Sequence, residues 1–178
     1  MNALNILMPL GMLTESLEMA LFDWFHLDLF DLIFVMTAVV FNLQIIGIYI
    51  AGKQKNHAMI KRFGTIVLAL SIPFAVVFMN HLGTSPVRWI TVGFCFIFLY
   101  LFVELLFDFI LKIEFRSNPL LHIPYIILFY IVQIALITIA FSIDTVSGYL
   151  VSISFWALLI SLIYALWPGS KAVLRHGE

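Results

Sequence analysis

Residues 31–62 decide the fold of this chain, and they read DLIFVMTAVVFNLQIIGIYIAGKQKNHAMIKR. The first part, residues 31–51, is apolar and long enough to cross a hydrocarbon core of roughly 30 Å as a helix that rises about 1.5 Å per residue. The second part, residues 53–62, carries four basic residues and no acid. Because positive charge is retained on the cytoplasmic side, the stretch indicates a transmembrane helix that ends at the cytoplasmic face.

The composition of the whole chain agrees with a membrane protein. Of its 178 residues, 63% are hydrophobic and 11% are charged, whereas a soluble domain has about 45–50% apolar and about 25% charged residues. So few polar groups cannot cover a surface that faces water, and we therefore expect contact with a lipid bilayer. The basic residues lie beside apolar runs and read as topology signals, so nucleic acid is not an expected partner.

Four further apolar runs follow the first, and capping residues mark several of their ends. The predicted spans are 31–51, 63–82, 87–111, 120–141 and 145–166. Asp144 is a suitable N-cap for the last of them, and Pro73 is expected to kink the second. The sequence therefore predicts an all-α, polytopic integral membrane helical bundle of five transmembrane helices over residues 31–167, followed by a short cytoplasmic tail, residues 168–178.

Positive charge is distributed unevenly between the gaps that separate the apolar runs. Eight of the nine basic residues fall in alternate gaps or in the tail, and Arg88 falls on the other side. The eight are Lys53, Lys55, Lys61, Arg62, Lys112, Arg116, Lys171 and Arg175. This pattern predicts an N-terminus outside and a C-terminus inside. The compact length and short loops favour a prokaryotic plasma membrane.

The N-terminal segment, residues 1–30, has a different pattern from the spans. Its apolar residues recur at helical spacing opposite Glu15, Glu18 and Asp23, which indicates an amphipathic interfacial helix on the outer surface. The alternative is a sixth span, which would place the N-terminus inside without moving the other five.

The third span carries acids within its apolar run. Glu104, Asp108 and Lys112 are four residues apart, so we expect them on one face of one helix. Asp108 and Lys112 lie near the cytoplasmic boundary, where they can form a salt bridge that fixes the depth of the helix. Glu104 lies deeper, by about seven residues or roughly 10 Å. An acid at that depth is costly and indicates a functional site, with structural hydrogen bonding as the alternative.

Polar side chains on the first and fourth spans reach similar depths in the bilayer. Together with the two acids they form a candidate polar intramembrane site that opens to the cytoplasm. Its residues are Glu104, Asp108, Asn42, Gln44, His122 and Tyr125. Gln133 lies nearer the midplane. For Asn42, Gln44 and Gln133 the alternative is that each forms an interhelical hydrogen bond worth about 0.6–2 kcal/mol.

Acidic and imidazole side chains collect at the opposite, outer boundary. They are Asp23, His26, Asp28, Asp31, Asn80, His81 and Asp144. Carboxylates and imidazoles bind metals, but acids also collect outside once positive charge is held inside, and Asp28 or Asp31 suits a helix N-cap. We therefore expect no metal site. Because the histidines all lie at boundaries or in loops, we expect no haem and no other cofactor.

Small residues recur on two of the spans. Ser147, Ser154 and Ser161 are seven residues apart on the fifth span, and Gly47 and Ala51 are four apart on the first. Small residues at such spacing let helices approach closely. We expect them to pack helices within the bundle or between the copies of a homo-oligomer.

Three functions are compatible with this sequence. The first is a non-enzymatic membrane binding partner or subunit of a larger assembly, favoured by short loops and the lack of a nucleophile–base pair. The second is a small oligomeric transporter or channel in which Glu104 responds to a proton or a cation. The third is an enzyme that acts on lipid at the cytoplasmic face, with Asp108, Lys112, Arg116 and His122 near the headgroups.

Overall fold

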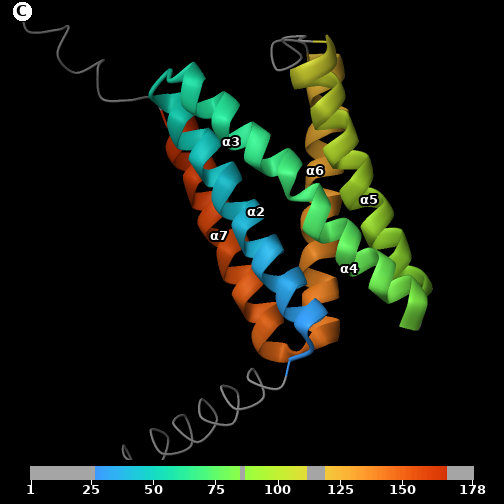
Figure 1. Cartoon of the computed structure of the whole chain (residues 1–178). Helices are drawn as coiled ribbons and strands as arrows, with labels where there is room; N and C mark the ends of the chain where they lie inside the picture. Colours follow the sequence, from blue (N-terminus) through green and yellow to red (C-terminus); the bar gives the residue numbers. More distant parts are fainter. Residues whose placement is uncertain (1–26, 85–86, 112–118, 168–178) are drawn as a thin grey trace, which may run out of the picture.

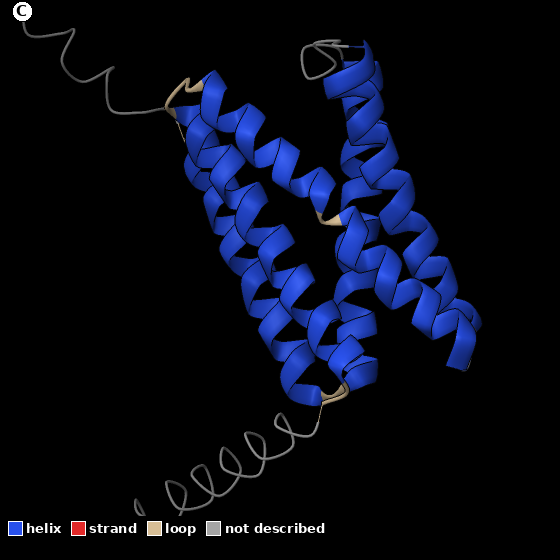
Figure 2. Cartoon of the chain, viewed as in Figure 1, coloured by secondary structure: helices blue, strands red, loops and turns tan. Residues whose placement is uncertain are grey.

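The computed structural model describes residues 27–84, 87–111 and 119–167, and over these ranges all regular structure is helical (Figure 2). The predicted amphipathic helix of residues 1–30 and the tail of residues 168–178 lie outside the described residues, apart from residues 27–30, the last two of which begin α2. The elements in chain order are α2 (Leu29–Lys53), α3 (His57–Ala69), α4 (Ser71–Thr84), α5 (Arg88–Glu104), the π-helix η1 (Leu105–Leu111), α6 (Pro119–Ile143) and α7 (Thr145–Leu166).

Five helical segments are long and apolar enough to cross a membrane, which confirms the all-α, multi-pass prediction. They are Leu29–Lys53, His57–Thr84, Arg88–Phe107, Ile123–Ile143 and Thr145–Leu166. Large apolar side chains cover the outside of the bundle, for example Ile134 at 65% exposed and Ile153 at 67%. A water-soluble protein would bury such side chains, so this surface suits lipid.

The helices are arranged as two pairs with a connecting segment between them (Figure 1). α2 packs along α7, and α5 packs along α6, while α6 and α7 join the two pairs at one end. α3 and α4 cross from α2 to α5. The two pairs approach each other at the end where α7 begins and diverge at the end where α2 finishes. The core combines aliphatic side chains with several aromatic ones, and the ring centroids of Phe34 and Phe94 are 5.7 Å apart.

The second span is broken into α3 and α4, which confirms the predicted kink. Pro73 has no N–H to donate to the carbonyl four residues earlier, and the helix breaks at Leu70, just after that position. The start of the span differs from the prediction. α3 begins at His57, where Asn56 accepts a hydrogen bond from the Met59 N–H at 3.1 Å, so residues 57–62 of the predicted basic loop are helical.

The third span changes its hydrogen-bonding pattern at Glu104. α5 ends there and the chain continues as the π-helix η1, in which the hydrogen bonds close from residue i to i+5. The regular α-helix expected over residues 87–111 therefore stops at Glu104. π-helical segments are frequent at functional sites, so the change draws attention to this part of the span.

Small and polar residues hold α2 against α7 inside one chain. Ser147, Ser154 and Ser161 are all buried within the bundle, so this part of the small-residue pattern packs helices of the same molecule. The Asn42 amide donates to Ser154 Oγ at 2.8 Å. Asp144 caps α7 as predicted, accepting hydrogen bonds from the backbone at its first turn.

Candidate functional site

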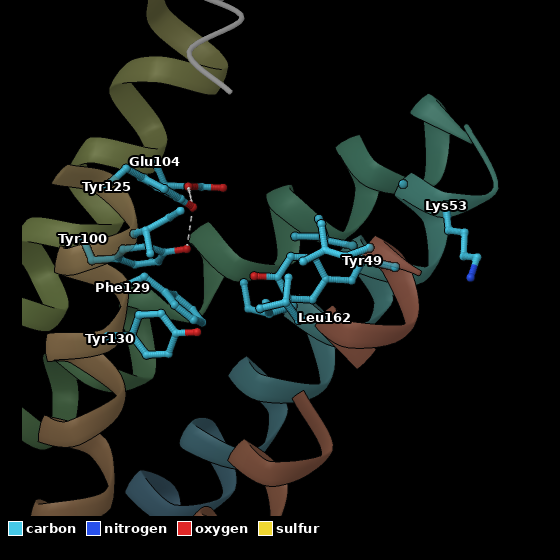
Figure 3. Close-up of a pocket in the computed structure, with 14 residues that line it drawn as sticks. Tyr49, Lys53, Tyr100, Glu104, Tyr125, Phe129, Tyr130 and Leu162 are labelled. Carbon is cyan, nitrogen blue, oxygen red and sulfur yellow. Dashed lines mark hydrogen bonds between the residues drawn. The ribbon is translucent and has the colours of Figure 1, made fainter. Parts of the chain in front are cut away.

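A cavity of about 450 Å³ lies between the α2–α7 pair and the α5–α6 pair, at the end where the pairs diverge (Figure 3). Its walls are mainly apolar and aromatic, and all of its lining comes from these four helices. The lining residues are Ile45, Ile48, Tyr49, Gly52, Lys53, Tyr100, Glu104, Tyr125, Ile126, Phe129, Tyr130, Leu162, Ala165 and Leu166. Pockets that bind small molecules commonly measure about 300–1,000 Å³ and have mostly apolar walls with a few polar groups.

Glu104 provides the acidic group of this cavity. Its side chain is 1% exposed, and the Tyr125 hydroxyl donates to Glu104 Oε2 at 2.6 Å. The Tyr125 and Tyr100 hydroxyls are 2.8 Å apart. Because Tyr125 gives its one proton to the carboxylate, Tyr100 must donate to Tyr125. The three groups therefore form a directed chain of hydrogen bonds that ends on the carboxylate, and this chain is visible in Figure 3.

Aromatic rings on α5 and α6 continue the wall beside Glu104. The Tyr100 ring lies 5.5 Å from the Tyr125 ring and 5.8 Å from the Phe129 ring, measured between centroids. Phe129 in turn lies 5.7 Å from Tyr130. Tyr100 precedes Glu104 by one helical turn, and Phe129 follows Tyr125 by one turn, so the ordinary α-helical repeat places each pair on one face. The wall places several aromatic rings beside one carboxylate.

The opposite wall comes from α2 and α7 and carries Tyr49, Leu162 and Lys53 (Figure 3). The Lys53 ammonium group donates to the Tyr164 carbonyl oxygen at 2.6 Å and lies 3.6 Å from the centre of the Tyr164 ring. The Tyr164 side chain is exposed and does not line the cavity. Two partners outside the cavity therefore hold the positive charge of Lys53, and in Figure 3 its amine points away from Glu104.

The structure brings together two of the six residues predicted from sequence for the polar site, Glu104 and Tyr125. Asn42 does not line the cavity and is bonded instead to Ser154. Gln44 does not line the cavity either. The side chains of Asp108 and His122 lie outside the described part of the structure, so the face that Asp108 shares with Glu104 stays a prediction.

Gln133 lies deeper in the bundle and is fully buried. Neither its amide nitrogen nor its amide oxygen has a hydrogen-bond partner among the described residues. The same is true of the Asn42 side-chain oxygen. These atoms are outside the cavity lining, so they bear on the stability of the bundle more than on the candidate site.

A second, smaller cavity of about 280 Å³ lies at the opposite end of the bundle, where Asp28, Asp31, Asn80 and His81 gather. The sequence offered Asp28 or Asp31 as the N-cap of the first span. Asp28 is the cap of α2, and its carboxylate accepts a hydrogen bond from the Leu29 N–H at 2.8 Å. Among the described residues, no group of three histidine, cysteine or acidic side chains could hold a metal ion. Asp23 and His26 lie outside the described residues.

Several cavity residues do not stand out in the sequence. Tyr100 and Phe129 resemble the many other aromatic residues of the spans, although each is one helical turn from a residue predicted for the site. Tyr49 and Tyr125 have the depth of an interfacial aromatic belt, but both line the cavity. Lys53 has the position of a stop signal at the end of a span. A search for aromatic residues one turn from Glu104 and Tyr125 would find the wall.

No protein-family model, curated protein or solved structure matches this chain.

Proposed function

We propose that this protein is a small multi-pass membrane transporter whose cavity between the helix pairs binds a solute, with Glu104 as the residue that responds to a proton or a cation. The observation that carries the proposal is the Glu104 carboxylate, almost fully buried in the wall of a mainly apolar cavity and bonded to Tyr125. Ionisable side chains within membrane spans are costly and are characteristic of transport pathways and proton relays.

The arrangement of the helices supports movement of a solute through the bundle. The cavity lies at the end where the two pairs diverge, and the pairs approach each other at the opposite end. Transporters commonly open to one side at a time, when one group of helices rocks against another around a central site.

The proposed orientation in the membrane follows from the basic residues. Lys53, Lys55, Lys61 and Arg62 lie at the end of the bundle that holds the cavity. Because such residues remain in the cytoplasm, the cavity opens to the cytoplasmic side, with the N-terminus outside and the C-terminus inside. The location that we propose is the plasma membrane of a prokaryote.

The cavity favours one of the three functions considered from sequence. In a subunit that only binds other membrane proteins, the bond from Tyr125 to Glu104 would hold α6 against α5, and the cavity beside it would have no role. The lipid-acting enzyme relies on Asp108, Lys112, Arg116 and His122 at the headgroups, and it assigns no role to Glu104. The transporter is the function that gives the cavity and Glu104 a joint role.

Solute uptake by proteoliposomes tests this function. Because the solute is not identified, the assay uses a broad mixture of compounds. Liposomes that contain the protein would be incubated with amines, amino acids, nucleosides and carboxylic acids, and the retained compounds would be identified by mass spectrometry. We expect at least one compound to be retained by wild-type protein and not by Glu104→Gln or by empty liposomes. Retention that is equal in all three preparations would reject the transporter.

A matched control separates loss of function from loss of the fold. Asp31→Asn makes the same acid-to-amide change at the other end of the bundle, where Asp31 lines the smaller cavity. This variant should retain the same compounds as wild type. If both variants lose uptake equally, the effect does not arise from the Glu104 site.

A further inference from the structure

We infer that the ligand of the cavity is a lipophilic organic cation, a molecule with one positive charge on an apolar or aromatic body. This inference depends on the proposed function, because it takes the cavity to be the ligand site. It adds the chemical class of the ligand, which follows from the shape, charge and aromatic content of the walls.

The apolar body of the ligand follows from the lining. Isoleucine, leucine, phenylalanine and tyrosine side chains account for ten of the fourteen residues around a space of about 450 Å³. A small hydrophilic solute would lose its water without regaining hydrogen bonds over most of this wall, and that loss is costly. An apolar body of drug size fills the space and gains from burial.

The positive charge of the ligand follows from the charged side chains of the lining. Apart from the tyrosines, the lining has two ionisable residues, Glu104 and Lys53. Glu104 is the acid, and its carboxylate is at the cavity wall beside Tyr125 and Tyr100 (Figure 3). Lys53 is the base, and its ammonium group is held on the Tyr164 carbonyl and ring, away from Glu104. A ligand inside the cavity therefore lies beside the Glu104 carboxylate, whereas the Lys53 ammonium group is already engaged by Tyr164.

The aromatic wall strengthens the same preference. The rings of Tyr125, Tyr100 and Phe129 follow one another, with neighbouring centroids 5.5 and 5.8 Å apart. A cation within about 6 Å of an aromatic ring centre is attracted by its negative face, by about 0.5–2 kcal/mol according to how fully it is desolvated. Quaternary ammonium groups are commonly bound in this way, because their charge is spread over apolar carbon and they need no hydrogen bonds.

Ca²⁺ or Mg²⁺ fits the site less well than an organic cation. These ions require about six oxygen ligands, whereas the lining supplies one carboxylate and a few phenolic oxygens, of which two already bond to each other. A lipophilic anion would place its charge against Glu104. Its binding near Lys53 is the competing outcome that the experiment must exclude.

Two probe ions of the same shape and opposite charge test the inference. Radiolabelled tetraphenylphosphonium and the anion tetraphenylborate would be titrated against the purified full-length protein in mild detergent by equilibrium dialysis. We expect saturable binding of the phosphonium. Contacts to an ionised group are stronger than contacts to a neutral one. We therefore expect the affinity of the protein for the phosphonium to fall by roughly tenfold or more in Glu104→Gln. Asp31→Asn should bind it like wild type.

Three outcomes would overturn the inference, and a fourth would reject transport alone. If well-folded wild-type protein, judged by its thermal unfolding and gel-filtration profile, gives no saturable phosphonium binding, the ligand class is wrong. Tighter binding of the borate that is lost in Lys53→Ala would assign the cavity to an anionic amphiphile instead. Uptake of another solute by proteoliposomes without phosphonium binding would reject the ligand class and keep the transporter. Phosphonium binding that needs Glu104, without uptake of any compound, would keep the ligand class and reject transport.

Discussion

Tyr125→Phe is expected to destabilise the bundle more than Tyr100→Phe, because the Tyr125 hydroxyl takes part in both hydrogen bonds of the Glu104 chain. It donates to Glu104 Oε2 at 2.6 Å and lies 2.8 Å from the Tyr100 hydroxyl. Tyr125→Phe removes both bonds, whereas Tyr100→Phe removes only the second. Both changes keep the aromatic rings, whose centroids are 5.5 Å apart, so the packing of the wall is preserved.

The magnitudes follow from the two kinds of bond. A hydrogen bond to a charged group contributes about 1.5–3 kcal/mol and one between neutral groups about 0.5–1.5 kcal/mol. Bonds between membrane helices fall toward the low end of such ranges, with an average near 0.6 kcal/mol. We therefore expect Tyr125→Phe to lower the free energy of unfolding by about 2 kcal/mol and Tyr100→Phe by about 0.6–1 kcal/mol.

Unfolding by dodecyl sulfate in mixed micelles, followed by circular dichroism, measures these free energies. Tyr149→Phe is the matched control, because the Tyr149 side chain is 60% exposed and faces the surroundings of the bundle; we expect a change within about 0.5 kcal/mol. In a Glu104→Gln background the effect of Tyr125→Phe should shrink by about 1 kcal/mol, since the bond to a charged group becomes neutral. Equal losses for Tyr100 and Tyr125, or no coupling to Glu104, would refute the directed chain.

Three further changes test the packing of the bundle by the same unfolding measurement. Ser154→Ala should lower stability by about 1–2 kcal/mol, because it leaves the buried Asn42 amide without its partner. It should destabilise the bundle more than Asn42→Leu does. A larger loss for Asn42→Leu would show that Asn42 has another partner. Gln133→Met should raise stability by about 1 kcal/mol, since no described residue bonds the Gln133 amide, and a loss would indicate a bound water or ligand there. Gly148→Ala should lower stability by about 1–3 kcal/mol, because its new methyl group would meet an aromatic ring; no change would show that the ring moves freely.

Much of the fold could be predicted from the sequence, because length, apolarity and caps act locally. The fifth span is observed at Thr145–Leu166, as predicted, and Asp144 caps it as expected. The break at Leu70 was predicted only approximately from Pro73. The π-helix that follows Glu104 was not predicted, because its apolar sequence fits an α-helix equally well and the choice depends on packing against other helices.

The candidate site could be predicted in part, because a sequence gives the depth of a residue in the bilayer but not its rotation about the helix axis. Glu104 was proposed from the cost of an acid at its depth, and Tyr125 from a depth near that of Asp108. Asn42 and Gln44 have suitable depths too, but helical spacing already separates them by about half a turn. The aromatic wall of Tyr100 and Phe129 depends on α5 and α6 lying side by side, which no local pattern encodes.

The central claim is that the cavity opens to the cytoplasm and favours positive charge because of Glu104. Chemical labelling of an introduced thiol tests this claim most directly. The chain has one cysteine, Cys95, so Leu162→Cys in a Cys95→Ser background places one thiol in the cavity lining. Ile153→Cys, on a side chain 67% exposed outside the bundle, is the control.

Cationic and anionic methanethiosulfonates that do not cross membranes would be applied separately to inside-out and right-side-out vesicles. For Leu162→Cys we predict reaction in inside-out vesicles only, faster with the cationic reagent by roughly tenfold, and loss of this preference in Glu104→Gln. The Ile153→Cys control should react slowly and without a preference for charge. Reaction from the outer side, or equal rates with both reagents in the presence of Glu104, would contradict the account.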